Sequence, residues 1–118
     1  MILLALSEGI FQKLSKILDF HKIKYQLVDS GEDLLDRAKR SKVSLIILEK
    51  DLPLLDGFAV TLLLKSNPKT AHIPIIAICK CNYPEEEIKA RDSGADYIVY
   101  YPFTEEEILK AMKEHIKK

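Results

Sequence analysis

The segment from Val43 to Gly57 constrains the fold of this chain more than any other stretch. It begins with a short, mostly apolar run, Val43–Leu48, that is rich in isoleucine and leucine. Such a run is typical of a β-strand that is buried on both faces in the middle of a parallel sheet. The run ends at Glu49, and a loop leads to Asp56-Gly57, where a helix is expected to start. A carboxylate in this place lies where open α/β sheets position their functional groups.

The rest of the chain alternates short apolar runs with segments of helical periodicity. We expect strands at residues 2–6, 25–28, 43–48, 73–79 and 96–101. Helical spacing, capping residues and acidic first turns predict helices that begin near residues 10, 30, 58, 84 and 104. This alternation predicts βαβ units, and hence one α/β domain over residues 1–118 with a doubly wound, five-stranded parallel sheet.

Composition excludes several classes of protein. Lysine plus arginine equal aspartate plus glutamate at 18 each, so no net charge draws the chain to nucleic acid or to an anionic membrane. The apolar opening, residues 2–6, is too short for a membrane span or a signal peptide. Cys79 and Cys81 are too few for a disulfide framework. We expect both to be reduced thiols in a cytoplasmic protein.

Three motifs carry a resemblance to a known family. The central segment reads L-I-I-L-x-x-x-L-P-x-x-D-G-F, G-A-D-Y occurs near Gly94, and Y-P-F spans Tyr101–Phe103. Together they resemble response-regulator receiver domains, which have the flavodoxin-like or CheY-like (βα)5 sandwich. The resemblance covers the whole chain. It implies the strand order 2-1-3-4-5 and a signalling role in a two-component, phosphorelay-type pathway.

The resemblance also indicates where a phosphorylation site would lie. In the family an aspartate accepts the phosphoryl group, an acidic pair holds Mg²⁺, and a serine or threonine and a lysine contact the phosphoryl oxygens. This chain has different residues at nearly all of these positions. Glu49 stands in place of the acceptor aspartate, and Cys79 in place of the serine or threonine. The acidic pair falls on Ser7-Glu8, or on Leu6-Ser7 with a shift of one residue. The lysine falls on Tyr101, or on Tyr100 if one residue is inserted.

These replacements predict a pseudo-receiver, which is neither an enzyme nor switched by aspartyl phosphorylation. Glutamate moves the acceptor oxygens by about 1 Å or more, and cysteine is a weak hydrogen-bond donor. The fixed positive charge is missing. Only Glu8, Glu49 and Asp51 remain as candidate metal ligands, so we expect no resident cofactor and weak Mg²⁺ binding. Glu49 itself is expected to be a solvated acid at the end of a strand.

Three alternatives stay open. The domain could be a weakly phosphorylatable receiver that takes phosphate from a histidine kinase, with Asp51 as a substitute acceptor. Glu49 could imitate a phosphorylated aspartate, held by Lys80 or a tyrosine hydroxyl. Finally, Cys79 and Cys81 could form a redox or soft-metal sensor, although a C-x-C motif alone lacks further ligands.

The helix expected at residues 58–66 suggests where partners bind. Phe58, Val60 and Leu64 suit its inner face, whereas Ala59, Leu62 and Leu63 form a second apolar stripe where receivers usually carry charge. We expect this second stripe to contact a protein partner, which could be a histidine kinase, an output domain or a second copy of the chain. The resemblance also predicts a cis peptide bond between Tyr101 and Pro102.

Overall fold

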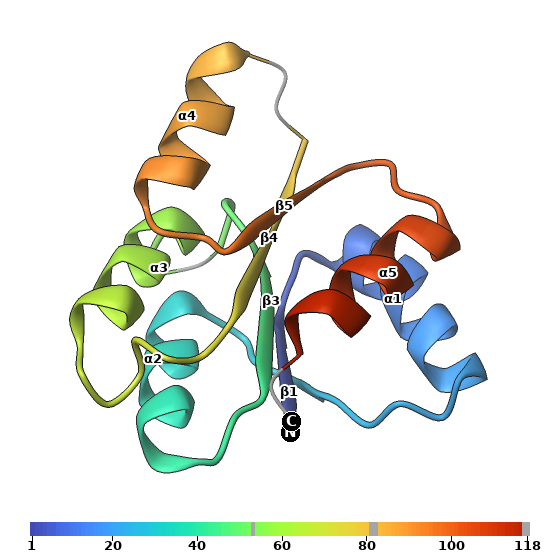
Figure 1. Ribbon diagram of the computed structural model, residues 1–118, viewed down its shortest axis with the longest axis horizontal. Coiled ribbons are helices and arrows are strands. Elements are labelled where there is room, and N and C mark those ends of the chain that lie inside the picture. The colour runs from blue at the N-terminus through green and yellow to red at the C-terminus, as the bar shows by residue number, and fades with distance from the viewer. Residues whose placement is uncertain (53, 81–82, 117–118) are drawn as a thin grey trace.

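The computed structural model describes residues 1–52, 54–80 and 83–116 and contains a five-stranded sheet flanked by five helices (Figure 1). The strands are β1 (Ile2–Ala5), β2 (Gln26–Leu27), β3 (Leu45–Glu49), β4 (Ile75–Cys79) and β5 (Tyr97–Tyr100). The helices are α1 (Glu8–Phe20), α2 (Gly31–Arg40), α3 (Gly57–Ser66), α4 (Pro84–Asp92) and α5 (Glu105–His115).

All strand pairs are parallel, and the strand order is β2-β1-β3-β4-β5. This confirms the predicted sheet and its doubly wound topology. β3 lies at the centre, with Ile47 opposite Leu4 of β1 and Ile76 of β4. Every residue of β1, β3 and β4 is buried, as expected for strands covered by helices on both faces.

Successive strand residues point alternately to the two faces of the sheet and contribute to two hydrophobic cores, one on each face. In Figure 1, α1 and α5 cover one face, and α2, α3 and α4 lie on the other. Leu4 and Ile47 pack in the core beneath α1 and α5 with Leu14 and Ile108. The opposite core contains the neighbouring strand residues, among them Leu3 and Leu48, together with Leu34, Val60 and Leu64.

The predicted helix starts are confirmed in detail. The Ser30 hydroxyl accepts a hydrogen bond from the Asp33 N–H at 3.0 Å and caps α2. Thr104 and Glu107 form a reciprocal capping box at the start of α5. These local bonds satisfy amide groups that have no partner within the helix, and they fix where each helix begins.

The strand boundaries differ slightly from the prediction. β2 contains only Gln26 and Leu27, and both are exposed at the edge of the sheet. β3 begins at Leu45, and the Ser44 N–H before it bonds to the carbonyl of Met1. The strand extends to Glu49, one residue further than predicted. The peptide bond between Tyr101 and Pro102 is cis, as predicted.

A lysine-centred cluster joins α3 to the segments directly before β4 and β5. Lys65 Nζ donates to the carbonyl of Ile73 at 2.8 Å and forms an ion pair with Asp96 Oδ2 at 2.7 Å. The same Asp96 oxygen accepts from the N–H of Ile75, also at 2.7 Å. Asp96 belongs to the G-A-D-Y motif, so that motif has a structural role here.

In the part of the chain that the structure describes, no helix has the length and apolar character needed to cross a bilayer.

Candidate functional site

The candidate site lies at the carboxyl edge of the sheet, where β3 and β4 end. A small hollow of about 90 Å³ opens there. Glu49, Lys50 and Asp51 approach it from the end of β3, and Cys79 and Lys80 from the end of β4. Phe58, Ile78 and Glu86 complete its lining. Glu49, Asp51 and Cys79 from the predicted set thus line one hollow, but Glu49 is arranged differently from the expectation.

Glu49 is buried, with only 3% of its surface exposed. Its Oε1 atom accepts a hydrogen bond from the backbone N–H of Ser7, the N-cap residue of α1. The expectation of a solvated acid is therefore wrong. The extra methylene lets the carboxylate reach from β3 to the loop after the neighbouring strand β1. An anion is also favoured at that place by the amide dipoles at the start of α1.

A close backbone contact fixes the direction in which β3 ends. A Cβ atom at Gly57 would lie 1.9 Å from the carbonyl oxygen of Glu49, so only glycine fits this position. The Gly57 N–H donates to the carbonyl of Lys50 at 2.8 Å. Asp56 then caps α3 by accepting from the N–H groups of Phe58 and Ala59. The D-G pair is thus explained by this contact and by the cap.

The three candidate metal ligands do not gather into one cluster, although Glu49 and Asp51 line the same hollow. Glu8 is exposed, and its Oε1 atom accepts from Gln12 Nε2 at 3.3 Å along the surface of α1. Asp51 is exposed at the rim of the hollow. Among the described residues, no group of three or more His, Cys, Asp or Glu side chains could hold a metal ion.

Cys79 ends β4 and is buried with 3% exposure. Its sulfur takes part in a disulfide, so the prediction of a reduced thiol at this position is wrong. The prediction rested on there being only two cysteines, which is too few for a disulfide framework but does not exclude a single bond. Cys81 lies outside the described residues.

Tyr101 is one of the two residues that the resemblance sets against the family's lysine. Its ring packs edge-on against Phe103 at 5.8 Å between ring centres. The ammonium group of Lys13, from α1, lies 5.5 Å from the centre of the Tyr101 ring and 4.7 Å from that of Phe103. Lys80 lies 6.0 Å from the Tyr101 ring on the site side. Cation–π attraction therefore holds positive charge beside the site.

Tyr100 is directed away from the site and toward α4. Its hydroxyl donates to Glu87 Oε1, which also accepts from Arg91 at 2.9 Å. The hydrogen bond from Tyr100, more than any other contact, lowers the pKa of Glu87. The same bond, followed by burial, raises the pKa of Tyr100. Tyr100 thus ties β5 to α4 and contributes no hydroxyl to the site.

Two of the three residues predicted for the outer stripe of α3 are exposed. Leu62 and Leu63 are 54% and 49% exposed, whereas Phe58, Val60 and Leu64 are buried. Ala59 is half-buried.

Two features of the site were missed in the sequence. Lys13 was not considered because cation–π contacts leave no fixed spacing along a chain. The Glu87–Arg91 pair was detectable as an i, i+4 pair within a helix. Its link to Tyr100 depends on how α4 packs on β5.

Comparison with known proteins decides the family. A sequence profile described as the response regulator receiver domain matches residues 7–113. The chain belongs to this family. The match begins at the N-cap of α1 and ends within α5, so it includes Ser7, Glu49, Cys79 and Tyr101. Receiver domains are the signalling modules of two-component systems, so this coarser part of the functional prediction stands.

Curated relatives with similar sequences are regulatory proteins of several kinds. The chain is 36% identical over 70 residues to a gliding motility regulatory protein of Myxococcus xanthus, and the match spans 58% of this chain but 9% of that protein. It is 34% identical over 74 residues, or 63% of the chain, to the transcriptional regulator RpaA of Synechocystis, of which 31% is covered. It is 28% identical over 87 residues, or 74% of the chain, to the response regulator DivK of Brucella ovis, of which 71% is covered.

Solved receiver structures share the fold. The receiver domain of a sensor histidine kinase from Pseudomonas aeruginosa, with magnesium in its active-site cleft, superposes with a TM-score of 0.87 at 22% identity and covers 97% of this chain and 94% of that one. The receiver domain of Ssk1 from Saccharomyces cerevisiae, in complex with the phosphotransfer protein Ypd1, gives a TM-score of 0.82 at 21% identity. That match covers 98% of this chain and 88% of the other.

The residues of this receiver do not fit a magnesium ion in the manner that the family implies. Such an ion requires several oxygen ligands in octahedral geometry. Glu49 is bonded to the Ser7 amide, and Glu8 lies along α1 beside Gln12. Asp51 is left as the one carboxylate of the predicted set that is exposed at the rim of the hollow.

Proposed function

We propose that this receiver domain is a pseudo-receiver, which signals in the cytoplasm through protein contacts and is not switched by phosphorylation. The observation that supports this most directly is the burial of Glu49 and its bond to the Ser7 amide. The carboxylate at the expected acceptor position already accepts a hydrogen bond within the domain. Cys79 and Tyr101 stand where the resemblance expects the serine or threonine and the lysine. In our proposal the domain has no enzymatic activity and needs no cofactor.

The test is to supply phosphoryl donors directly. The purified domain is incubated with acetyl phosphate and Mg²⁺, or with beryllofluoride and Mg²⁺. Intact mass and amide NMR shifts are then recorded. We expect no added mass and no shifts at Ser7, Glu49 or Lys80. A receiver that retains aspartate, treated in parallel, confirms that the reagents are active. Stable added mass on the wild-type domain would overturn the proposal.

The alternative function, a weakly phosphorylatable receiver, is supported by the exposure of Asp51 at the rim of the hollow. It predicts added mass that disappears in Asp51→Asn and remains in Glu49→Gln. The lack of a lysine at Tyr101 argues against it, because phosphoryl transfer relies on fixed positive charge. A histidine kinase or phosphotransfer protein would be the donor in this case.

We further propose that Ala59, Leu62 and Leu63 form the contact surface for a protein partner on α3. Leu62 and Leu63 are exposed next to each other on a face of α3 that carries no charge. Adjacent exposed apolar side chains of this kind tend to mark interaction sites. The variant Leu62→Glu/Leu63→Glu should lose the contact. The matched control is Lys16→Glu/Lys110→Glu, on exposed positions of α1 and α5. If both variants fold and behave alike in pull-down and sedimentation, α3 is not the interface.

A further inference from the structure

Charge is distributed unevenly between the two edges of the sheet. Acidic side chains near helix starts and basic ones near helix ends are favoured by the helix dipole. In a parallel α/β fold all helices start at the carboxyl edge, so these local preferences add up. The first turns of α2, α4 and α5 are acidic and their last turns are basic; the acids are Glu32, Asp33, Glu85, Glu86, Glu87, Glu105, Glu106 and Glu107. Three of the five described helices are therefore acidic at the carboxyl edge of the sheet and basic at the amino edge.

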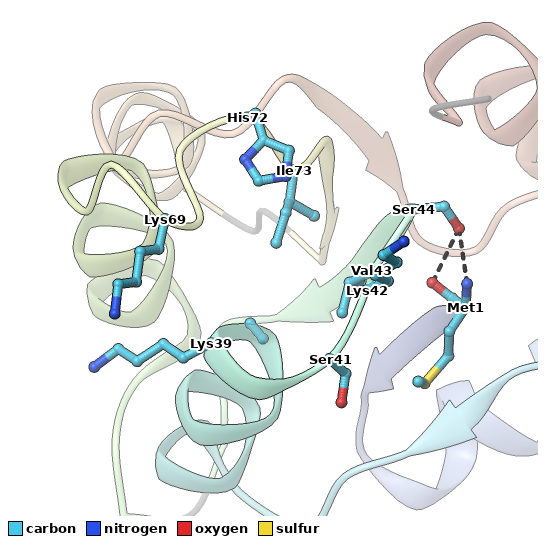
Figure 2. Close-up of a pocket in the computed structure, with 10 residues that line it drawn as sticks. Met1, Lys39, Ser41, Lys42, Val43, Ser44, Lys69, His72 and Ile73 are labelled. Carbon is cyan, nitrogen blue, oxygen red and sulfur yellow. Dashed lines mark hydrogen bonds between the residues drawn. The ribbon is translucent and has the colours of Figure 1, made fainter.

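A hollow of about 530 Å³ lies at the basic amino edge. It is formed by the end of α2, the loop into β3 and the loop between α3 and β4 (Figure 2). Ala38, Val43 and Ile73 are buried and give it an apolar floor. Figure 2 shows the side chains of Lys39 and Lys69 extending to the same side, away from the helix and the loop that carry them. Lys42 and His72 complete the basic rim.

The positive charge at this rim is only partly compensated, because Lys39 also lines a neighbouring hollow that contains Glu32, Asp33 and Asp36. Among the ion pairs of the described residues, none includes Lys39, Lys42 or Lys69. No carboxylate lines the hollow. Asp36, on the same helix, is paired with Arg40. A surface with an apolar floor and unpaired cations at its rim is complementary to an acidic segment that also presents an apolar or aromatic side chain.

The described part of this chain contains such a segment at its opposite end. Tyr83 is 66% exposed and directly precedes the acidic first turn of α4. Glu85 is exposed beside it, and Glu86 is half-buried. Figure 1 shows the start of α4 at the far end of the molecule from the end of α2. The two complementary surfaces therefore cannot meet within one molecule.

We infer that the amino-edge hollow binds the segment Tyr83–Glu87 of a second copy of this chain. In this contact the Tyr83 ring covers the apolar floor, and Glu85 and Glu86 face Lys39 and Lys69. Because the contact joins two different surfaces, each copy keeps one of each, and copies add head to tail. Exposed ion pairs contribute little individually, so the association is weak and sensitive to salt. This inference is independent of phosphorylation and of the α3 surface.

Charge reversal on either side tests the contact. One variant carries Lys39→Glu/Lys69→Glu, and the other carries Glu85→Lys/Glu86→Lys. Sedimentation of the wild type at about 1 mM should show association at about 20 mM salt that disappears at about 300 mM. Each variant alone should associate at least about tenfold more weakly, because like charges then face each other. An equimolar mixture should associate again, since each variant supplies the charge that the other lacks.

The control is Lys16→Glu/Lys110→Glu, which changes net charge by the same amount on the opposite face and should associate like the wild type. Circular dichroism and thermal unfolding establish that every variant is folded. The inference fails if the wild type stays monomeric at low salt or if the mixture does not associate. If the monomer instead binds a polyglutamate peptide at the hollow, the occupant is an acidic partner and not a second copy. The acetyl phosphate experiment is unaffected by any of these outcomes.

Discussion

The carboxylate of Glu49 at the end of β3 accepts a hydrogen bond from the backbone N–H of Ser7 at the start of α1, 42 residues earlier in the chain. This bond joins the two loops that, in the resemblance, would hold a metal ion between them. The side chain thus connects β3 to α1. Several consequences can be measured.

Removing the Glu49 carboxylate should destabilise the domain and free the loop after β1. Glu49→Ala leaves a buried amide without its partner and should lower the free energy of unfolding by about 1–3 kcal/mol. Glu49→Asp should behave similarly because its shorter side chain does not reach Ser7. Glu49→Gln keeps an acceptor and should lose less. Urea unfolding and hydrogen exchange at Ser7 measure these effects. Wild-type exchange at Ser7 in Glu49→Ala would refute the role of this bond.

Lys65 should contribute to stability through its buried contacts. Lys65→Met keeps the apolar part of the side chain but removes the donor to Ile73 and Asp96, and we expect a loss of about 1–2 kcal/mol. Asp96→Asn should cost less, because an amide oxygen can still accept from the N–H of Ile75. Chemical denaturation measures both. The exposed Lys110→Met is the matched control and should be neutral, and equal losses in Lys65→Met and Lys110→Met would contradict the prediction.

Lys22 should be replaceable by glycine with a gain in stability. It follows the last turn of α1 with φ of 58°, and the Ile23 N–H bonds back to the carbonyl of Leu18 at 2.9 Å. This left-handed position strains a side chain by about 1 kcal/mol, and helices usually place glycine there. Lys22→Gly should therefore raise the melting temperature. Lys24→Gly, at a residue without positive φ, should lower it. A lower melting temperature in Lys22→Gly would show that no strain is relieved.

The Tyr100–Glu87 bond should make stability depend on pH at both extremes. The pKa of Glu87 is lowered, so its contribution is complete above the ordinary value of 4.5 and is lost as pH falls through the lowered value. The pKa of Tyr100 is raised, so its contribution is complete below 10.0 and is lost as pH rises through the raised value. In Tyr100→Phe both dependences should weaken. Ultraviolet titration of tyrosinate and pH-dependent unfolding test this, and Tyr97→Phe is the control.

The sequence predicted the topology well because the fold is encoded in local patterns that repeat along the chain. Ser30, Asp56 and Thr104 mark helix starts through bonds to residues two or three positions away. Buried strands are apolar whatever their neighbours are. The site was harder to predict, because the direction of a side chain depends on distant residues. Nothing near Glu49 in the sequence reveals that it reaches Ser7, and nothing near Tyr100 reveals that it bonds to α4.

The segment between Lys50 and Gly57 starts and ends at almost the same point in space, because the Gly57 N–H bonds to the Lys50 carbonyl and its backbone lies against Glu49. Leu54, within this segment, is 80% exposed. Both ends are fixed by the backbone, so the chain near Leu54 can be altered without moving Glu49. A fluorophore attached at residue 54 would therefore sit beside α2, where Leu54 shares a hollow with Glu32 and Asp36, and would report a partner that arrives there while the sheet stays undisturbed.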